Sequence, residues 1–165
     1  MQASFVTIGP GAAGILDTLH RMRAIVRAQQ AVPIVRLPAV ALTKGTGFDG
    51  AAQIRKLRLF LHDHTEFVRD PTGVELLQTP DYLLTQIRRG DIVAGDCDDL
   101  AMLAAALGMS IGLRARFVAL GRGRLEHVFT ELADPRTMHW TDLDLTRPRR
   151  GIPPAMWATS LVVEL

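Results

Sequence analysis

The chain holds one cysteine, and the residues around it favour its use as a nucleophile. Cys97 lies in the segment 95–100, Gly-Asp-Cys-Asp-Asp-Leu, and an apolar run over 101–107 follows at once. This pattern predicts that a helix begins at about Cys97. Backbone N–H groups at a helix N-terminus favour an anion, so they stabilise the thiolate form of a cysteine there. A lone cysteine has no partner for an internal disulfide, which leaves thiol chemistry as its functional use.

Three carboxylates flank the sulfur and complicate that interpretation. The charges of Asp96, Asp98 and Asp99 oppose ionisation of the thiol, whereas a paired imidazolium lowers the pKa of a cysteine strongly, and we expect the imidazolium to dominate. Acidic residues in a first helical turn also stabilise the helix by about 0.3–1 kcal/mol. The alternative is an inert core thiol, the common fate of a lone cysteine. We expect the flanking acids to oppose deep burial.

A histidine and two aspartates follow Cys97 in the order that thiol catalysis needs. A nucleophile requires a base beside it and a third group that orients the base. His127, in the strand-like segment 126–129, is the predicted base. Asp144 is our first choice as the orienting residue and Asp142 the second. A spacing of two places both on one face of a strand, so direction alone does not choose between them. The alternatives are a half-exposed strand histidine and strand-end carboxylates.

Hydrophobic periodicity predicts the elements that must position these residues. Helices are expected over 12–30, 51–67 and 97–109, with a short helix capped by Asp81 that runs through Ile87 and ends at Gly90. Pro33 and Pro38 are expected to break the chain between the first two helices. Strands are expected over 4–8, 114–120, 126–132, 137–143 and 160–165. Helices first and strands later predict an α+β fold, with the helices packed on one antiparallel sheet.

Length and composition indicate a single globular domain with no nucleic-acid partner. The chain has 165 residues, 48% of them hydrophobic, which fits a single globular domain over 1–165. The net charge is +2 with scattered arginines, so we expect no nucleic-acid partner. No apolar run reaches the length that spans a bilayer, and the N-terminus does not resemble a signal peptide. A single cysteine favours a cytoplasmic protein; incorporation in a virion would also need no signal.

Two other motifs are weaker. The segment 9–14 matches G-x-G-x-x-G, but Pro10 removes a backbone N–H and no alternation of strands and helices follows, which argues against a dinucleotide site. His62 and His64 are two residues apart on a predicted helix and point to different faces, so a solvated surface is expected. The acids around Cys97 lack the spacing of a calcium loop. We therefore expect no cofactor and no metal.

The three catalytic candidates lie in segments that resemble one family. The segment 95–99 with its helix resembles the active-site entry of the transglutaminase-like superfamily of papain-type thiol enzymes. The segment 127–131, His-Val-Phe-Thr-Glu, resembles the histidine strand of that family, and 140–146 resembles its Trp-x-x-x-Asp-x-Thr segment. The stretch from Val68 to Pro80 is similar to small transglutaminase-like proteins of tailed phages and prophages. The resemblance covers about 54–146.

This resemblance implies a transglutaminase-like core over 54–146. Residues 1–50 lie outside it, and we expect them to form an N-terminal helical extension. It implies a triad of Cys97, His127 and Asp144 that forms an acyl-enzyme on a peptide or isopeptide bond. The backbone N–H of Cys97 would donate to the oxyanion, and Gln78 is a candidate second donor or else a loop amide that caps a turn. A peptidase is expected, with a peptide or protein substrate. The alternative is a phage virion structural or tail-assembly protein that uses the fold as a docking module with little or no catalysis.

Overall fold

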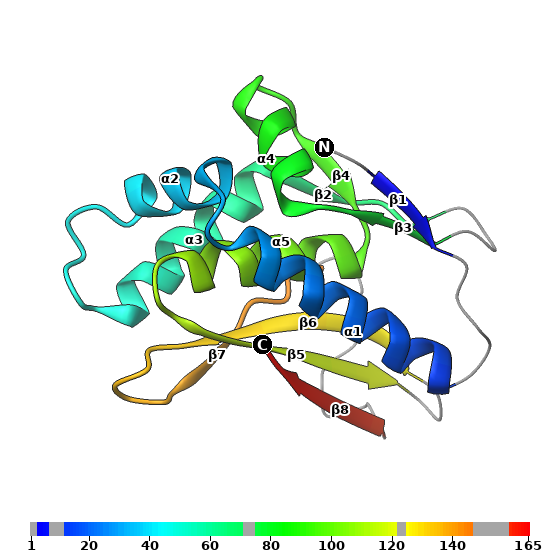
Figure 1. The fold of residues 1–165 in the computed structure, drawn as a ribbon. Coiled ribbons are helices and arrows are strands. Elements are labelled where there is room, and N and C mark those ends of the chain that lie inside the picture. Colours follow the sequence, from blue (N-terminus) through cyan, green and yellow to red (C-terminus); the bar gives the residue numbers. More distant parts are fainter. Residues whose placement is uncertain (1–2, 7–11, 71–74, 122–124, 147–158) are drawn as a thin grey trace.

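One helix, α5 (Cys97–Ser110), lies at the centre of the fold, between a layer of helices and a β-sheet (Figure 1). The computed structural model describes residues 3–6, 12–70, 75–121, 125–146 and 159–165. The other elements, in chain order, are β1 (Ala3–Val6), α1 (Ala12–Gln29), α2 (Pro33–Leu42), α3 (Gly50–His64), β2 (Thr65–Phe67), β3 (Glu75–Gln78), α4 (Pro80–Arg88), β4 (Val93–Gly95), β5 (Arg114–Gly121), β6 (Leu125–Ala133), β7 (Trp140–Asp142) and β8 (Thr159–Glu164). The predicted α+β fold is confirmed.

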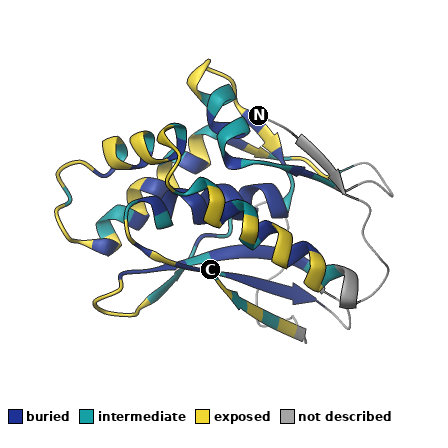
Figure 2. Ribbon diagram, in the orientation of Figure 1, coloured by how far each residue is buried: buried dark blue, intermediate teal, exposed yellow. Residues whose placement is uncertain are grey.

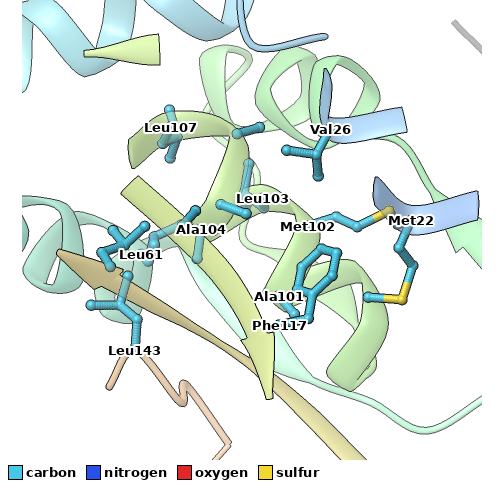
Figure 3. Packing of buried hydrophobic residues seen from close by; sticks show 14 of the residues in the cluster. Met22, Val26, Leu61, Ala101, Met102, Leu103, Ala104, Leu107, Phe117 and Leu143 are labelled. Atoms are coloured by element: carbon cyan, nitrogen blue, oxygen red, sulfur yellow. The ribbon is translucent and has the colours of Figure 1, made fainter. Parts of the chain in front are cut away.

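Helix α5 is buried nearly all round because its sequence is apolar on every face. Residues 100–107 are all buried, as the dark blue of the central helix shows in Figure 2. Met22 from α1, Leu61 from α3, Phe117 from β5 and Leu143 pack around it (Figure 3). A helix that is hydrophobic all round belongs in a core. Its N-terminus is therefore held by contacts on several sides.

The main sheet has the strand order β7-β6-β5-β8, and its neighbouring strands are antiparallel. Its two faces differ in what they contact. Val128 belongs to the central core, and Thr130 donates from its Oγ1 to the carbonyl of Ala101 in α5 at 2.7 Å. Phe129 instead belongs to a small cluster with Val118 and Leu120. Even-numbered positions of β6 thus face α5, as the alternation of a strand requires.

Two small sheets were not expected from the sequence. Strand β1 pairs with β3 in antiparallel register, and β2 pairs with β4 in parallel register. The predicted helix over 51–67 is wrong in its last three residues, which form β2. The β-branched Thr65 ends the helix in an extended conformation, and its Oγ1 donates to the carbonyl of Leu61 at 2.8 Å. Strands of three or four residues are too short for a periodicity to mark them.

The expected break at two prolines is wrong for Pro38, because α2 begins at Pro33 and runs through Pro38. Pro33 stands in the first turn, where its missing N–H costs nothing. Pro38 lies inside the helix, where a proline removes one intrahelical hydrogen bond. Val35 and Ala39 are completely buried in the core on one face of α2. This packing, with the bond that Arg36 donates to the carbonyl of Ser110 at 3.0 Å, outweighs the loss.

The short helix α4 forms where predicted, but Asp81 does not cap it. Thr79 is the N-cap residue, and Asp81 lies in the first turn. The Oδ1 of Asp81 accepts a hydrogen bond from Nε2 of Gln29 at 2.8 Å, and its backbone N–H donates to Oε1 of Gln29 at 2.8 Å. Asp81 therefore ties α4 to the end of α1. Among the described residues, no helix has the length and apolarity needed to cross a bilayer.

Candidate functional site

Cys97 is the first residue of α5, as the sequence predicted. Asp96 is the N-cap, and its carboxylate accepts the backbone N–H of Asp98 at 3.0 Å. The thiol is half-buried, and its Sγ donates to Oδ1 of Asp98 at 3.5 Å. This contact favours the protonated form of the sulfur, because a carboxylate accepts a hydrogen bond from a thiol and repels a thiolate.

The acids beside Cys97 are more buried than we expected. Asp98 is 8% exposed and Asp99 is not exposed at all. Burial is tolerated because N–H groups reach the Asp99 carboxylate from Gln78 and Asp96. One ligand atom from each of Asp96, Cys97 and Asp98 lies within 4.8 Å of the others. Such a cluster is common without a bound ion and by itself assigns no metal site.

His127 and Asp144 form a buried pair. Nε2 of His127 lies 2.8 Å from Oδ2 of Asp144, and the two side chains are 3% and 5% exposed. The other oxygen of Asp144, Oδ1, accepts the backbone N–H of Thr146 at 2.9 Å and its Oγ1–H at 2.7 Å. A carboxylate only accepts hydrogen bonds, so the proton of the pair lies on Nε2. Whenever the ring is neutral, Nδ1 carries its lone pair.

The surroundings of Asp144 favour its ionised form. Burial opposes ionisation of this carboxyl, but the hydrogen bond and charge of His127 and the two bonds from Thr146 outweigh burial. The pKa of Asp144 is therefore lowered from its usual value of 3.8. A carboxylate that stays charged can stabilise an imidazolium when His127 accepts a proton.

Asp142 contacts the backbone rather than the imidazole in the bonds described. Its Oδ1 accepts the N–H of Asp144 at 2.6 Å, and it stands opposite Glu131 in the pairing of β7 with β6. Asp142 thus shapes the turn in which Asp144 stands. The sequence left both aspartates open because their spacing places them on one strand face, but β7 ends at Asp142 and Asp144 lies beyond the strand.

Gln78 lies at the end of β3, and its amide is already engaged. Nε2 donates to the carbonyl of Ala94 at 2.9 Å and to Oδ2 of Asp99 at 2.8 Å. An amide nitrogen has two hydrogens, so these two bonds use both. A role for Gln78 as oxyanion donor would require one of the bonds to break, and that role stays a prediction.

The start of β6 and the start of α5 lie at the same end of the fold, and the two elements run in the same direction (Figure 1). The bond from Thr130 to Ala101 joins them one helical turn after Cys97 and three residues after His127. His127 itself shares a face with Phe129, with ring centroids 5.9 Å apart, and not with Thr130. The register of β5 with β6 shifts between Leu120 and Gly121, directly beside His127. Such irregularities increase twist and redirect side chains next to functional sites.

The sequence indicated no role for Thr130 or Thr146 and only a helix-stabilising role for the charge of Asp99, although each makes a contact next to a candidate residue. Thr146 was visible as the last residue of the 140–146 segment, and its spacing of two from Asp144 is typical of an Asx-type turn. Thr130 and Asp99 act through contacts between elements far apart in sequence. No local pattern marks such contacts.

The glycine-rich segment 9–14 has few residues that the structure describes, since 7–11 lie outside the described part. The strand before it, β1, pairs antiparallel with β3. A dinucleotide-binding unit needs parallel strands around its phosphate loop. His62, at the other weak motif, is an exposed residue whose Nδ1 lies 3.5 Å from the neighbouring Asp63.

Comparisons with known proteins show a similarity of fold. No family model matches the sequence, and no curated protein matches it. A solved structure from Parabacteroides distasonis, described as "a putative protease", is 14% identical, with a TM-score of 0.56 over 75% of this chain and 25% of its own. One from Cytophaga hutchinsonii, described as "a putative cysteine protease", is 15% identical, with a TM-score of 0.55 over 94% of this chain and 54% of its own. The chain thus spans a quarter to about half of these proteins, and it shares their α+β fold.

Proposed function

We propose that this protein is a thiol-dependent hydrolase or acyltransferase of the peptidase type, acting on peptide or isopeptide bonds. The observation that carries the proposal is the buried His127–Asp144 pair, whose 2.8 Å contact holds Nε2 against the carboxylate and so makes Nδ1 the nitrogen that would act as base. Cys97 supplies the nucleophile from the N-terminus of α5. The fold shared with proteins described as proteases supports this class of reaction.

In this mechanism Nδ1 of His127 takes the proton of Cys97, and the sulfur attacks the carbonyl carbon of the substrate. The carbonyl electrons move to oxygen, and the backbone N–H of Cys97 donates to that oxyanion. The imidazolium then gives its proton to the leaving amine as the C–N bond breaks, which leaves an acyl-enzyme. Water, deprotonated by His127, releases the acid and restores the thiol. Asp144 keeps the ring in the required tautomer throughout.

The proposal requires the start of β6 to bring the imidazole to the N-terminus of α5. Strict alternation from Thr130 would turn His127 to the other face of the sheet, whereas the bulge beside His127 increases the local twist. It also requires the thiol proton to leave Asp98, which lies 3.5 Å from the sulfur.

The alternative is a phage structural or assembly protein that uses this fold as a docking module. The contact of the thiol with Asp98 favours this alternative, because it stabilises an unreactive sulfur. The two hypotheses differ in whether the sulfur forms covalent bonds with substrates. Under either hypothesis, residues 1–165 form one domain, and its transglutaminase-like core covers 54–146.

A peptide library tests the choice. The protein and its Cys97→Ser variant are incubated with the library, and new peptide termini are read by mass spectrometry. We expect new termini with the wild type and none with Cys97→Ser, at equal helical content by circular dichroism. Cleavage that survives in Cys97→Ser would exclude the thiol mechanism. Absence of cleavage, together with labelling of Cys97 no faster than that of an ordinary thiol, would favour the docking module.

A further inference from the structure

The carboxylate of Asp99, in the first turn of α5, accepts hydrogen bonds from two other segments that meet beside Cys97. Its Oδ1 accepts the backbone N–H of Gln78 in β3 at 2.7 Å, and its Oδ2 accepts Nε2 of the same residue at 2.8 Å. Oδ2 also lies 3.4 Å from the backbone N–H of Asp96, the N-cap of α5. Asp99 has no exposed surface. One side chain thus links β3, the turn before α5 and the first turn of α5.

The fit around Asp99 is close. A Cβ on Gly95, the last residue of β4, would lie 2.9 Å from Cβ of Asp99. The absence of a side chain at position 95 therefore lets the turn lie directly against the carboxylate. Gln78 is braced in turn by its bond to the carbonyl of Ala94. Asp96 and Asp99 form a capping box, in which the side chain of each accepts the backbone N–H of the other. Cys97 stands between these two residues, so the box holds the backbone from which its sulfur and its N–H extend.

We propose that Asp99 is a positioning residue that fixes the orientation of Cys97 by clamping β3 and the β4–α5 turn to the first turn of α5. The inference rests on the proposed function, since it concerns how the nucleophile is held for its reaction. Burial is the main cause that raises the pKa of Asp99 to about 7, and the nearby charge of Asp96 also raises it. The hydrogen bonds from Gln78 lower this pKa but do not offset the burial. Burial of this carboxyl is unfavourable, and what it provides in return is two oxygen acceptors for the N–H groups of Gln78 and Asp96.

Asp99→Asn is the informative substitution. It keeps the size of the side chain but replaces one acceptor oxygen with an NH2 group. That group then faces another donor, which is either the backbone N–H or the side-chain Nε2 of Gln78. We expect the rate of Cys97 alkylation by iodoacetamide to fall about tenfold, because small misplacements of a reacting group are costly. Amide hydrogen exchange at Gln78 and Asp96, resolved by nuclear magnetic resonance, is expected to accelerate. Asp134→Asn, at the far end of β6, is the matched control and should change neither readout.

A second variant separates positioning from loss of stability. Gln78→Met removes the side-chain donor that would oppose the NH2 group introduced by Asp99→Asn, while the backbone N–H at position 78 remains. We therefore expect Gln78→Met combined with Asp99→Asn to recover part of the alkylation rate that Asp99→Asn loses. Unchanged alkylation in Asp99→Asn, in a protein where His127→Ala slows it, would overturn the positioning role and leave the proposed function standing. Wild-type labelling at the rate of free glutathione, insensitive to His127→Ala, would instead reject the proposed function and the positioning role with it.

Discussion

Nε2 of His127 and Oδ2 of Asp144 lie 2.8 Å apart, and almost no solvent reaches either side chain. A hydrogen bond to a charged group is stronger where water is excluded. The bond fixes both the orientation of the imidazole and the nitrogen that carries its proton. The chemistry available to this protein follows from which group meets the remaining ring nitrogen.

The two aspartates are expected to differ in their contribution to activity. Asp144→Asn offers an NH2 group or a weaker acceptor to Nε2 and disturbs the tautomer, so kcat/KM on a cleaved peptide should fall by roughly 10²- to 10⁴-fold. Asp142→Asn keeps an amide oxygen for the N–H of Asp144, and we expect a loss below about tenfold. The reverse ranking in steady-state kinetics would move the orienting role to Asp142.

The bond between α5 and β6 should matter for reactivity as well as for stability. Thr130→Val removes the hydroxyl that donates to Ala101, and we expect a loss of about 1 kcal/mol in the free energy of unfolding. Thr65→Val is the matched control, because Thr65 makes the same kind of buried bond to a helix carbonyl at the end of α3. Urea unfolding should show similar losses, whereas only Thr130→Val should slow alkylation of Cys97. Equal labelling of both variants would show that this bond does not help align the site.

The raised pKa of Asp99 predicts an unusual dependence of stability on pH. Its pKa is about 7 in the folded protein and 3.8 in a model peptide, so the folded state binds more protons than the unfolded state between these values. The free energy of unfolding should therefore fall as pH rises through this window, by at most about 1.4 kcal/mol for each pH unit from this group. The lowered pKa of Asp144 acts below the window, since its stabilisation is lost only as pH falls through its folded pKa.

Urea unfolding at several pH values checks this dependence. Subtracting the curve of Asp99→Asn from that of the wild type isolates the contribution of Asp99. Asp81→Asn is a suitable control because the pKa of Asp81 is lowered, so its titration lies outside the window. Parallel curves for the wild type and Asp99→Asn between about pH 4 and 7 would contradict the raised pKa.

The sequence predicted the elements whose signals are local. First-turn acids and an apolar run marked α5, and alternation with turns marked β5 and β6. It failed at α2, where burial of Val35 and Ala39 outweighs the intrinsic effect of Pro38. It also missed β2, β3 and β4, which are too short to show a period and are defined by their partners. In the site, local patterns predicted Cys97 at a helix start but not the burial of its acidic neighbours, which depends on Gln78 from a distant strand.

The rate at which iodoacetamide alkylates Cys97 at mildly acidic pH tests the central claim most directly. It is measured by mass spectrometry for the wild type, for His127→Ala and for His139→Ala, an exposed histidine outside the site. We expect a wild-type rate at least about tenfold above that of a free thiol, a loss of this excess in His127→Ala, and no change in His139→Ala. A wild-type rate equal to that of a free thiol and unaffected by His127→Ala would contradict it.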